Sequence, residues 1–543
     1  MEQPIPSCAD CTENAPGGGG NTRKKNIVFS PRKPCSADGE IMAQSTQLKH
    51  EISNKVPTMI SVKNDPLSEW FSNTRGLQGR RIWLVGAGGT GVSGLARLLN
   101  KRGAVVSGSD SEASPAVKAL QAAGFDIAVG DVKELPTDCE LVIATAAAKS
   151  DHPQLVAAMK KNIPTRTYAQ ALGLLQLGHT AVCVAGTHGK STTTCMLTWC
   201  LLHAGFDPGF IAGATCGSLG GSARAGAAIL SKGPYSHKPG FLVTESCEFD
   251  RSFHQLHPTT AIINNVESDH LDCYKSLDEI IESFHVFARR LPAAVDGGYM
   301  LIAHEVAQRE RVTREVSAAI ETFGWHPAAD YVVEMAANGL ARVHNKHVEI
   351  LRWQPRLFGA HNVLNGAGAG IMALKLGADR ASVEEALTSF AGVDRRLEFV
   401  GERKVGAESV RVYDDYGHHP TEVRVTLEAL KNATKPRKLI CLFQPHQHSR
   451  TRLLLEDFGA CFTAADHVLL TDIHFVRDAQ SERALVSSQD VADRIRKHGG
   501  TVECVGTIEA GAARLNEIAQ AGDVVVTMGA GPVYRAAHIF LRK

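Results

Sequence analysis

Residues 183–193 read CVAGTHGKSTT, and this stretch decides the fold of the chain. Residues 181–185 have the length and apolar composition of a short buried strand, and residues 191–203 continue with helical character. Between them, residues 186–190 form a tight, glycine-containing turn. Such a turn directs backbone N–H groups and the positive end of the following helix at an anion. The stretch therefore predicts a phosphate-binding loop in an α/β domain.

Two side chains at the end of the turn favour a nucleoside triphosphate as the anion. The Lys190 ammonium adds a fixed charge for the β- and γ-phosphates, and the Ser191 hydroxyl suits Mg²⁺. The standard motif has glycine where this chain has Val184, so the loop is the shorter G-T-x-G-K-[S/T] variant. A helix start rich in glycine and threonine, with no ligand, is the alternative. The residues predicted to bind ATP here are Gly186, Thr187, Gly189, Lys190, Ser191 and Thr192.

A second glycine turn, GAGGTG, follows a predicted strand at residues 81–85 and opens a helix that runs through residue 101. The next predicted strand, residues 104–107, is followed by Asp110, which matches a dinucleotide-binding fingerprint. This pattern indicates a site for a diphosphate without saying whose, because NAD(P) and a UDP-sugar both carry one. A purely structural turn is the third possibility. The glycines concerned are Gly86, Gly88, Gly89 and Gly91.

Ionisable residues follow two further predicted strands, at residues 241–244 and 261–264. Glu245 and Glu248 come after the first, and His270 after the second. Magnesium prefers oxygen ligands and keeps waters, so a hydroxyl, a carboxylate and a histidine can complete such a site. We therefore predict Ser191, Glu245 and His270 as metal ligands. The alternative is that these acidic side chains are merely solvated, which applies more to Glu248 than to Glu245.

The last part of the chain again alternates strands with helices, after a less regular region that extends to about residue 358. This alternation predicts a parallel sheet. Polar clusters follow three of the strands, at residues 414–415, 444–448 and 529–531, where open parallel sheets gather ligands. The predicted strands are residues 410–413, 439–443, 467–470 and 524–527.

The composition is typical of a soluble enzyme of several domains: 543 residues, 44% hydrophobic and 21% charged. A formal net charge of +1 argues against a nucleic-acid or membrane-surface partner, and no apolar run reaches the ~18–20 residues of a membrane span. The 13 cysteines are scattered, many in apolar runs, which is typical of reduced thiols in the cytoplasm. Cys8 and Cys11 lack the second pair that a zinc site would need.

The N-terminal region differs from the rest of the chain. Residues 1–50 contain GGGG, RKK, several prolines and few periodic apolar positions, without the apolar core of a signal peptide. We predict a disordered extension over residues 1–77.

Eight motifs occur in the order found in the Mur ligases: GAGGTGVSGLA, GTHGKSTTT, ESCEFDRSF, NNVESDHLDCY, GAHNVLN, DRRLEF, DDYGHHPTEV and FQPHQHSRTR. The chain resembles that family over residues 78–543. The resemblance implies three α/β domains, each a mainly parallel sheet with flanking helices: Rossmann-like domains at residues 78–178 and 392–543, and a P-loop ATPase-like domain at residues 179–391. The last two motifs resemble the alanine-adding branch of the family.

In function, the resemblance implies an ATP- and Mg²⁺-dependent ligase that joins L-alanine to the lactyl carboxylate of UDP-N-acetylmuramate through an acyl phosphate. The GAGGTG turn would then bind the UDP diphosphate. The partners would be these small molecules, without nucleic acid or membrane insertion, and the protein would be a cytoplasmic monomer or weak homodimer. An NAD(P)-dependent oxidoreductase, a non-catalytic nucleotide sensor and a Mur-type ligase with another acceptor stay open as alternatives.

The resemblance also implies roles for individual residues. His361, Asn362 and Asn365 would lie near the adenine and ribose, and Arg396 and Asp415 would reach ATP from the third domain. The residues implied near the alanine and the substrate carboxylates are Tyr416, His418, His419 and Arg450. The residues implied in catalysis are Lys190, Glu245, His270, His418 and Arg450. The chain departs from the family pattern in having ESCEFD for EADESD, Gln447 where arginine is common, and Pro532 after the final GAG.

Overall fold

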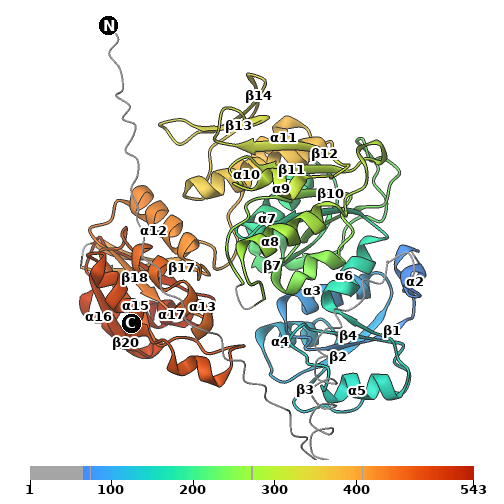
Figure 1. Ribbon diagram of the computed structural model, residues 1–543, viewed down its shortest axis with the longest axis horizontal. Helices are drawn as coiled ribbons and strands as arrows, with labels where there is room; N and C mark the ends of the chain where they lie inside the picture. The colour runs from blue at the N-terminus through green and yellow to red at the C-terminus, as the bar shows by residue number, and fades with distance from the viewer. Residues whose placement is uncertain (1–64, 74, 271–272, 407, 543) are drawn as a thin grey trace, which may run out of the picture. The chain divides into compact units, whose positions relative to one another are not determined.

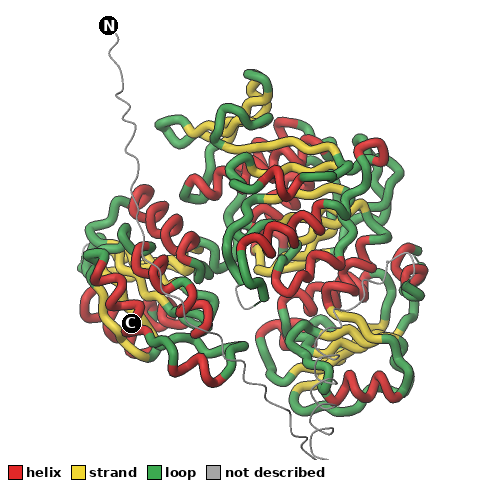
Figure 2. Tube along the Cα trace, in the orientation of Figure 1, coloured by secondary structure: helices red, strands yellow, loops and turns green. Residues whose placement is uncertain are grey.

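The computed structural model describes residues 65–73, 75–270, 273–406 and 408–542. Their strands form three sheets with helices between them, which confirms the predicted α/β class (Figures 1 and 2). Each of the predicted ranges 78–178, 179–391 and 392–543 encloses one sheet. The exact domain boundaries stay a prediction.

The first sheet has five parallel strands in the order β3-β2-β1-β4-β5. This order matches five of the six strands of the doubly wound nucleotide-binding sheet, 3-2-1-4-5-6, with the glycine turn after the central strand. Its strands are β1 (Arg81–Val85), β2 (Val105–Asp110), β3 (Asp126–Val129), β4 (Leu141–Ala144) and β5 (Thr165–Thr167). Its helices are α3 (Thr90–Lys101), α4 (Pro115–Ala122), α5 (Pro153–Lys160) and α6 (Tyr168–Gln176).

The second sheet has ten strands in the order β15-β14-β13-β12-β11-β10-β6-β9-β7-β8. Strand β6 (Thr180–Ala185) is wholly buried between β10 (Thr260–Ile263) and β9 (Phe241–Glu245), so the phosphate loop emerges near the middle of the sheet. The remaining strands are β7 (Gly209–Cys216), β8 (Gly221–Arg224), β11 (Tyr299–Ala303), β12 (Ala319–Gly324), β13 (Tyr331–Met335), β14 (Ala341–Asn345) and β15 (Val348–Trp353). The helices are α7 (Lys190–His203), α8 (Leu277–Ala288), α9 (Arg309–Thr313), α10 (Ala360–Lys375) and α11 (Arg380–Ser389).

The third sheet has six strands in the order β16-β17-β21-β18-β19-β20, all parallel except the β16–β17 pair. Its strands are β16 (Glu398–Val405), β17 (Glu408–Asp415), β18 (Leu439–Phe443), β19 (His467–Thr471), β20 (Val502–Gly506) and β21 (Val524–Met528). Its helices are α12 (Pro420–Thr434), α13 (His448–Leu453), α14 (Leu455–Ala460), α15 (Ser488–Lys497), α16 (Ile508–Ile518) and α17 (Tyr534–Leu541).

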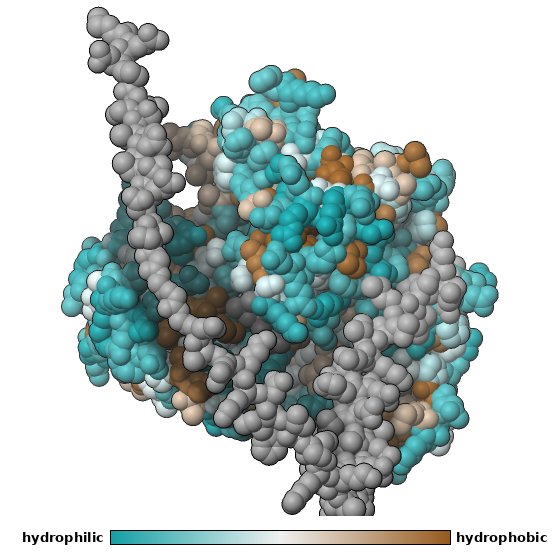
Figure 3. All heavy atoms as spheres, in the orientation of Figure 1, coloured by the Kyte–Doolittle hydropathy of each residue, from teal (hydrophilic) through white to brown (hydrophobic). Residues whose placement is uncertain are grey.

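The apolar side chains are buried mainly against the faces of the sheets. One continuous cluster of buried residues extends from Leu67 to Val393, and the third sheet has its own clusters. On the face shown in Figure 3, hydrophilic side chains cover most of the described surface, with scattered apolar patches. No helix among the described residues is long and apolar enough to cross a membrane. Six cysteines in the described part of the chain are buried free thiols, and Cys8 and Cys11 lie outside it.

The segment just before the first sheet corrects the predicted extent of the N-terminal extension. Residues 1–64 lie outside the described residues, but helix α2 (Ser68–Ser72) falls within the predicted 1–77. Leu67, Phe71 and Leu77 are buried in the main core. Leu67 and Phe71 are four residues apart, which is helical spacing, but one short turn gives too weak a periodic signal to be recognised.

Two truncations should separate the two parts of this segment. Removing residues 1–64 should leave the midpoint of urea unfolding unchanged. Removing residues 1–77 should lower it, because burying a side chain such as Leu67 or Phe71 contributes about 1.5–3 kcal/mol. The second truncation also removes Asp65, whose Oδ1 lies 2.6 Å from Nη2 of Arg166. Equal midpoints for the two truncated proteins would contradict the packing described here.

Candidate active site

The phosphate loop depends on glycine at two positions where the backbone is left-handed. Gly186 has φ 141° and Gly189, the N-cap of α7, has φ 78°. A Cβ atom on Gly189 would lie 2.4 Å from Oδ1 of Asn365, which belongs to α10. Glycine at position 189 therefore allows both the turn and the close approach of α10.

Lys190 is held in place by the loop and by a buried carboxylate. Its ammonium donates to the carbonyl oxygens of Gly186 at 2.6 Å and Thr187 at 3.0 Å, and lies 2.9 Å from Oε2 of Glu248. Burial alone would lower the pKa of Lys190, but the charge of Glu248 raises it above its usual value. Burial likewise opposes ionisation of Glu248, yet Lys190 holds its pKa below the usual value. Glu248 is therefore not a solvated acid, which corrects that alternative.

Two of the predicted metal ligands contact each other. Oγ of Ser191 donates to Oε2 of Glu245 at 2.7 Å, and the backbone N–H of Gly213 donates to the same oxygen at 2.6 Å. The third predicted ligand, His270, contacts neither of them: its Nε2 lies 3.5 Å from Oε1 of Glu248, which pairs with Lys190. A hydroxyl and a carboxylate next to the phosphate loop fit the oxygen preference of magnesium.

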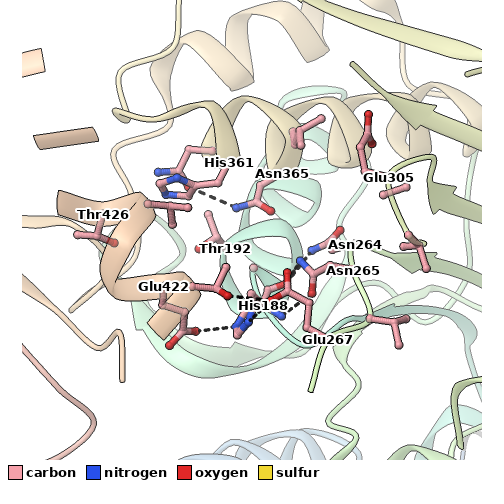
Figure 4. A pocket seen from close by; sticks show the side chains of 18 of the residues that line it. His188, Thr192, Asn264, Asn265, Glu267, Glu305, His361, Asn365, Glu422 and Thr426 are labelled. Atoms are coloured by element: carbon pink, nitrogen blue, oxygen red, sulfur yellow. Dashed lines mark hydrogen bonds and ion pairs between the residues drawn. The ribbon is translucent and has the colours of Figure 1, made fainter. Parts of the chain in front are cut away.

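A cavity of about 410 Å³ opens beside the phosphate loop, within the size range of small-molecule sites (Figure 4). Figure 4 shows His188 and Thr192 on one side of it, and His361 and Asn365 of α10 nearby. Residues predicted to bind ATP that line it are Gly189, Thr192, His361, Asn362, Asn365, Arg396 and Asp415. The structure thus brings together residues from three distant parts of the sequence.

Hydrogen bonds orient the polar side chains of α10 that face the cavity. Nδ2 of Asn362 donates to the carbonyl of Phe358 at 2.8 Å, and Nδ2 of Asn365 donates to Oδ1 of Asn362 at 3.3 Å. Burial lowers the pKa of His361 to about 4, so its imidazole is neutral at pH 7. These groups offer a neutral, polar surface, which suits a nucleoside better than a phosphate.

An arginine just before the third sheet and an unusual carboxyl group at the end of its strand β17 line the same cavity. Asp415 accepts hydrogen bonds from the backbone N–H groups of Leu397 at 2.6 Å and Gly417 at 2.7 Å. Burial raises its pKa to about 7, although Arg396 opposes the shift. The Arg396 guanidinium lies 5.0 Å from the ring centroid of Tyr416.

The residues predicted to meet the acceptor amino acid differ in how their side chains are engaged. Arg450 of α13 is buried and donates to Oδ1 of Asp269 at 3.0 Å, and its Nη2 lies 3.4 Å from Nδ1 of His270. Burial lowers the pKa of His418 to about 4, and its Nδ1 lies 3.1 Å from the carbonyl of Tyr416. Nδ1–H of His418 therefore donates to that carbonyl, which leaves Nε2 as the acceptor nitrogen.

His419 has a structural role in the described structure. Its Nδ1 accepts from the N–H of Thr421 at 3.3 Å and caps α12, and its Nε2 lies 3.0 Å from the carbonyl of Ser268. Because both ring nitrogens have protein partners, His419 is a weaker candidate than His418 for contact with the amino acid.

The N-terminal glycine turn is organised by Asp110. Oδ2 of Asp110 accepts from the N–H of Gly88 at 2.8 Å, and Oδ1 accepts from the N–H of Glu112 at 3.1 Å. Gly86 has φ 74°, Gly89 is the N-cap of α3, and a Cβ on Gly91 would lie 2.7 Å from the ring of Tyr168. Asp110 therefore stabilises the turn itself, so its presence does not call for the ribose of NAD.

Sequence reasoning did not single out four residues that connect the elements around the cavity: His188, Glu267, Asp269 and Glu422. Their partners lie far away in the sequence, so spacing gives no sign of them. The one local signal is the capping box of α12, formed by His419 and Glu422. Histidine is not among the preferred N-cap residues, so this signal is weak.

Comparisons with known proteins agree with this geometry. Residues 81–179 match the Mur ligase family, catalytic domain; residues 184–373 the Mur ligase middle domain; and residues 395–531 the Mur ligase, glutamate ligase domain. The chain is 34% identical to the UDP-N-acetylmuramate–L-alanine ligase of Caldanaerobacter subterraneus over 86% of its length and 98% of that protein. The chain belongs to the Mur ligase family.

Other Mur ligases are similar to this chain over nearly its whole described length. The UDP-N-acetylmuramate–L-alanine ligase of Geobacter sulfurreducens is 35% identical over 85% of this chain and 97% of its own length. The crystal structure of the UDP-N-acetylmuramate-alanine ligase of Thermotoga maritima aligns with a TM-score of 0.68 and 26% identity, over 85% of this chain and 98% of that one. A murein peptide ligase of Psychrobacter arcticus aligns with a TM-score of 0.64 and 25% identity, over 86% and 98%. Because the GAGGTG turn lies within the first Mur ligase match, the oxidoreductase alternative is set aside.

Proposed function

We propose that this protein is an ATP-dependent ligase that joins L-alanine to the lactyl carboxylate of UDP-N-acetylmuramate in peptidoglycan precursor synthesis. The carboxylate attacks the γ-phosphate of ATP to give an acyl phosphate and ADP, and the alanine amine then displaces phosphate. The observation that carries the proposal is the single cavity lined by the phosphate loop, α10 and residues of the third sheet. The names of the relatives at 34–35% identity support it.

The residues around the phosphate loop suit the first step. A carboxylate and a triphosphate repel each other, so their approach needs cations that are already in place. Lys190 is held by Glu248 and two carbonyls, and Arg396 lines the neighbouring cavity. When bound, Mg²⁺ would neutralise phosphate charge, and Ser191 and Glu245 would hold it with His270 nearby. The GAGGTG turn at Gly86, Gly88, Gly89 and Gly91 would hold the UDP diphosphate.

The second step needs an amine that loses its proton as the amide bond forms. Nε2 of His418 is the proposed acceptor of that proton, because the imidazole is neutral and its other nitrogen faces a carbonyl. Arg450 is the proposed cation for the substrate carboxylates, and Tyr416, whose ring contacts that of His418, is a further proposed contact of the amino acid. Exclusion of water by the closed site would protect the acyl phosphate from hydrolysis.

We also propose that the protein works in the cytoplasm, as a monomer or a weak homodimer. Its described cysteines include six buried free thiols, Cys183, Cys195, Cys200, Cys216, Cys441 and Cys461, which suit a reducing compartment.

Phosphate release measured with UDP-N-acetylmuramate, ATP, Mg²⁺ and a panel of amino acids tests the function directly. Release should require all four components and should stop on addition of EDTA. The panel should include the tripeptide that contains diaminopimelate, because a murein peptide ligase is among the structural relatives. Release that does not depend on UDP-N-acetylmuramate would overturn the proposal.

The same assay should show graded selectivity for the amino acid. One methyl group in an apolar pocket is worth about 1–3 kcal/mol, so glycine should react about 10–200-fold less efficiently than L-alanine. Serine should also react slowly, because an apolar pocket rejects a hydroxyl only modestly. D-Glutamate, with a second carboxylate, should give no product. A higher catalytic efficiency for D-glutamate or the tripeptide would contradict alanine specificity while leaving an amide ligase in place.

A further inference from the structure

One side chain of the phosphate loop points away from the loop, toward the third-sheet region. His188 lies between Thr187 and Gly189, and its side chain is only 12% exposed. Its Nδ1 lies 3.1 Å from Oε1 of Glu422, on the first turn of α12. Its Nε2 lies 3.6 Å from Oε2 of Glu267, in the segment after β10. Figure 4 shows His188 between these two carboxylates.

His188 is a cation in this setting. Burial alone would lower its pKa, but the ion pair with Glu267 and the hydrogen bond to Glu422 raise it to about 10. Both carboxylates have pKa values below the usual range: His188 lowers that of Glu267, and at Glu422 burial is outweighed by the charges of His188 and Arg396. An imidazolium therefore joins two carboxylates from separate elements.

Neighbouring contacts hold the same two elements together. Oγ1 of Thr421 donates to Oε2 of Glu267 at 2.9 Å, and the His188 and His419 ring centroids are 4.9 Å apart. The N-terminal end of α12 thus packs against the segment after β10, and His188 contacts both.

A divalent cation is the competing explanation for this cluster. The candidate ligand atoms of His188, Glu267 and His419 lie within 4.8 Å of one another. Both nitrogens of His419 already have protein partners, however, and a metal would require a neutral His188. The imidazolium between two carboxylates accounts for the geometry without displacing any bond.

Glu422 connects His188 to the catalytic groups. Nη1 of Arg396 lies 3.6 Å from Oε1 of Glu422, the oxygen that also faces Nδ1 of His188. The other oxygen, Oε2, accepts from the backbone N–H groups of His418 and His419 at 3.0 and 3.3 Å. A displacement of the phosphate loop would therefore be transmitted through one carboxylate to Arg396 and His418.

We propose that His188 is a positioning residue. Its ion pairs with Glu422 and Glu267 couple the phosphate loop to the docking of residues 395–542 against the region of the second sheet. This inference rests on the proposed function for its catalytic meaning, whereas docking itself can be measured without substrates. Nucleotide that orders the loop would fix His188, and His188 would fix Arg396 over the cavity.

The stability of the docked state should decrease as the pH rises. A histidine whose pKa is raised in the docked state stabilises that state fully below its ordinary pKa of 6.5, and the contribution disappears as the pH rises through about 10. The other groups that face it keep one charge state across this range. Burial keeps His418 and His419 neutral, Glu267 and Glu422 stay ionised, and Arg396 and Lys190 stay charged.

The test compares wild type, His188→Gln and His188→Arg in the full chain, with the exposed His498→Gln as the matched control. Small-angle X-ray scattering measures docking, calorimetric titration measures the Kd for ATP, and steady-state assays give kcat. His188→Gln should increase the radius of gyration at about pH 7.5, lower kcat, and weaken the Kd for ATP by about 5–150-fold, the usual range of coupling between sites, because Arg396 and Asp415 of the docked part line the nucleotide cavity. His498→Gln should match wild type.

The conservative variant and the pH series distinguish coupling from general damage. His188→Arg should restore the docked scattering profile, and its radius of gyration should stay constant between about pH 8 and 11, where that of wild type should increase. The wild-type series carries the test if a variant fails to fold. A constant wild-type radius over this range, or a weaker Kd for ATP in His188→Gln with unchanged scattering, would overturn the proposal. A failure to ligate alanine with this pH response intact would overturn the proposed function alone.

Discussion

Lys190→Ala should lower kcat for ligation by about 100- to 1,000-fold, the effect of removing one preorganised electrostatic donor, worth about 2.7–4 kcal/mol. Lys190 is the cation that the phosphate loop itself presents, and three hydrogen-bonding partners fix its position before nucleotide binds. The measurement is phosphate release under saturating ATP, UDP-N-acetylmuramate and L-alanine.

The same substitution should also reduce stability, although a loop lysine would ordinarily leave stability unchanged. The Glu248 side chain is only 2% exposed, so removing Lys190 leaves a buried carboxylate with less compensation. Breaking one side of a buried ion pair costs about 3–5 kcal/mol. Glu248→Gln added to Lys190→Ala should recover much of the unfolding free energy without recovering turnover.

The matched control is Lys431→Ala, which removes a lysine whose ion pair with Asp466 is exposed. Exposed pairs contribute about 0–1 kcal/mol, so this variant should retain both turnover and stability. Turnover of Lys190→Ala equal to that of Lys431→Ala would remove the phosphate loop from the proposed mechanism.

The local features of the fold were predictable because their signals are contained in a few consecutive residues. Strands 81–85, 141–144 and 439–443 were predicted with the bounds that the structure gives to β1, β4 and β18. Each is a short apolar run between turn residues, which leaves little choice of state. The hairpins of β13, β14 and β15 were missed, because the short sequences YVVEM and VEILRW of β13 and β15 are neither continuous apolar runs nor strictly alternating.

The candidate site was predictable to the extent that its residues follow buried strands. Ser191 and Glu245 were predicted together and are in contact, since both emerge from neighbouring strands of the second sheet. Glu248 was predicted to be the more solvated of the two carboxylates but is buried. Its burial depends on Lys190 and on the segment that carries His270, which its position after a strand does not indicate. His188 and Glu422 are 234 residues apart, so only the folded chain brings them together.

Arg450→Met should abolish most ligase activity, because Arg450 is the proposed cation for the substrate carboxylates and its ion pair with Asp269 also joins α13 to the segment after β10. The guanidinium is 9% exposed and its partner Asp269 is 7% exposed, so the pair is buried. The charge of Arg450 holds the pKa of Asp269 far below its usual range despite burial. Losing Arg450 leaves that charge next to His270 with less compensation, at a cost of about 3–5 kcal/mol.

Arg452→Met provides the control two residues away on the same helix, because the ion pair of Arg452 with Glu482 is partly exposed, at 40% and 22%. That variant should keep its activity and its unfolding free energy within about 1 kcal/mol. The double variant Asp269→Asn/Arg450→Met should regain stability but not turnover, since it removes the unpaired charge without restoring a cation for the substrate. If turnover also returned in the double variant, Arg450 would act only through docking. If Arg450→Met matched Arg452→Met in both measurements, neither role would stand.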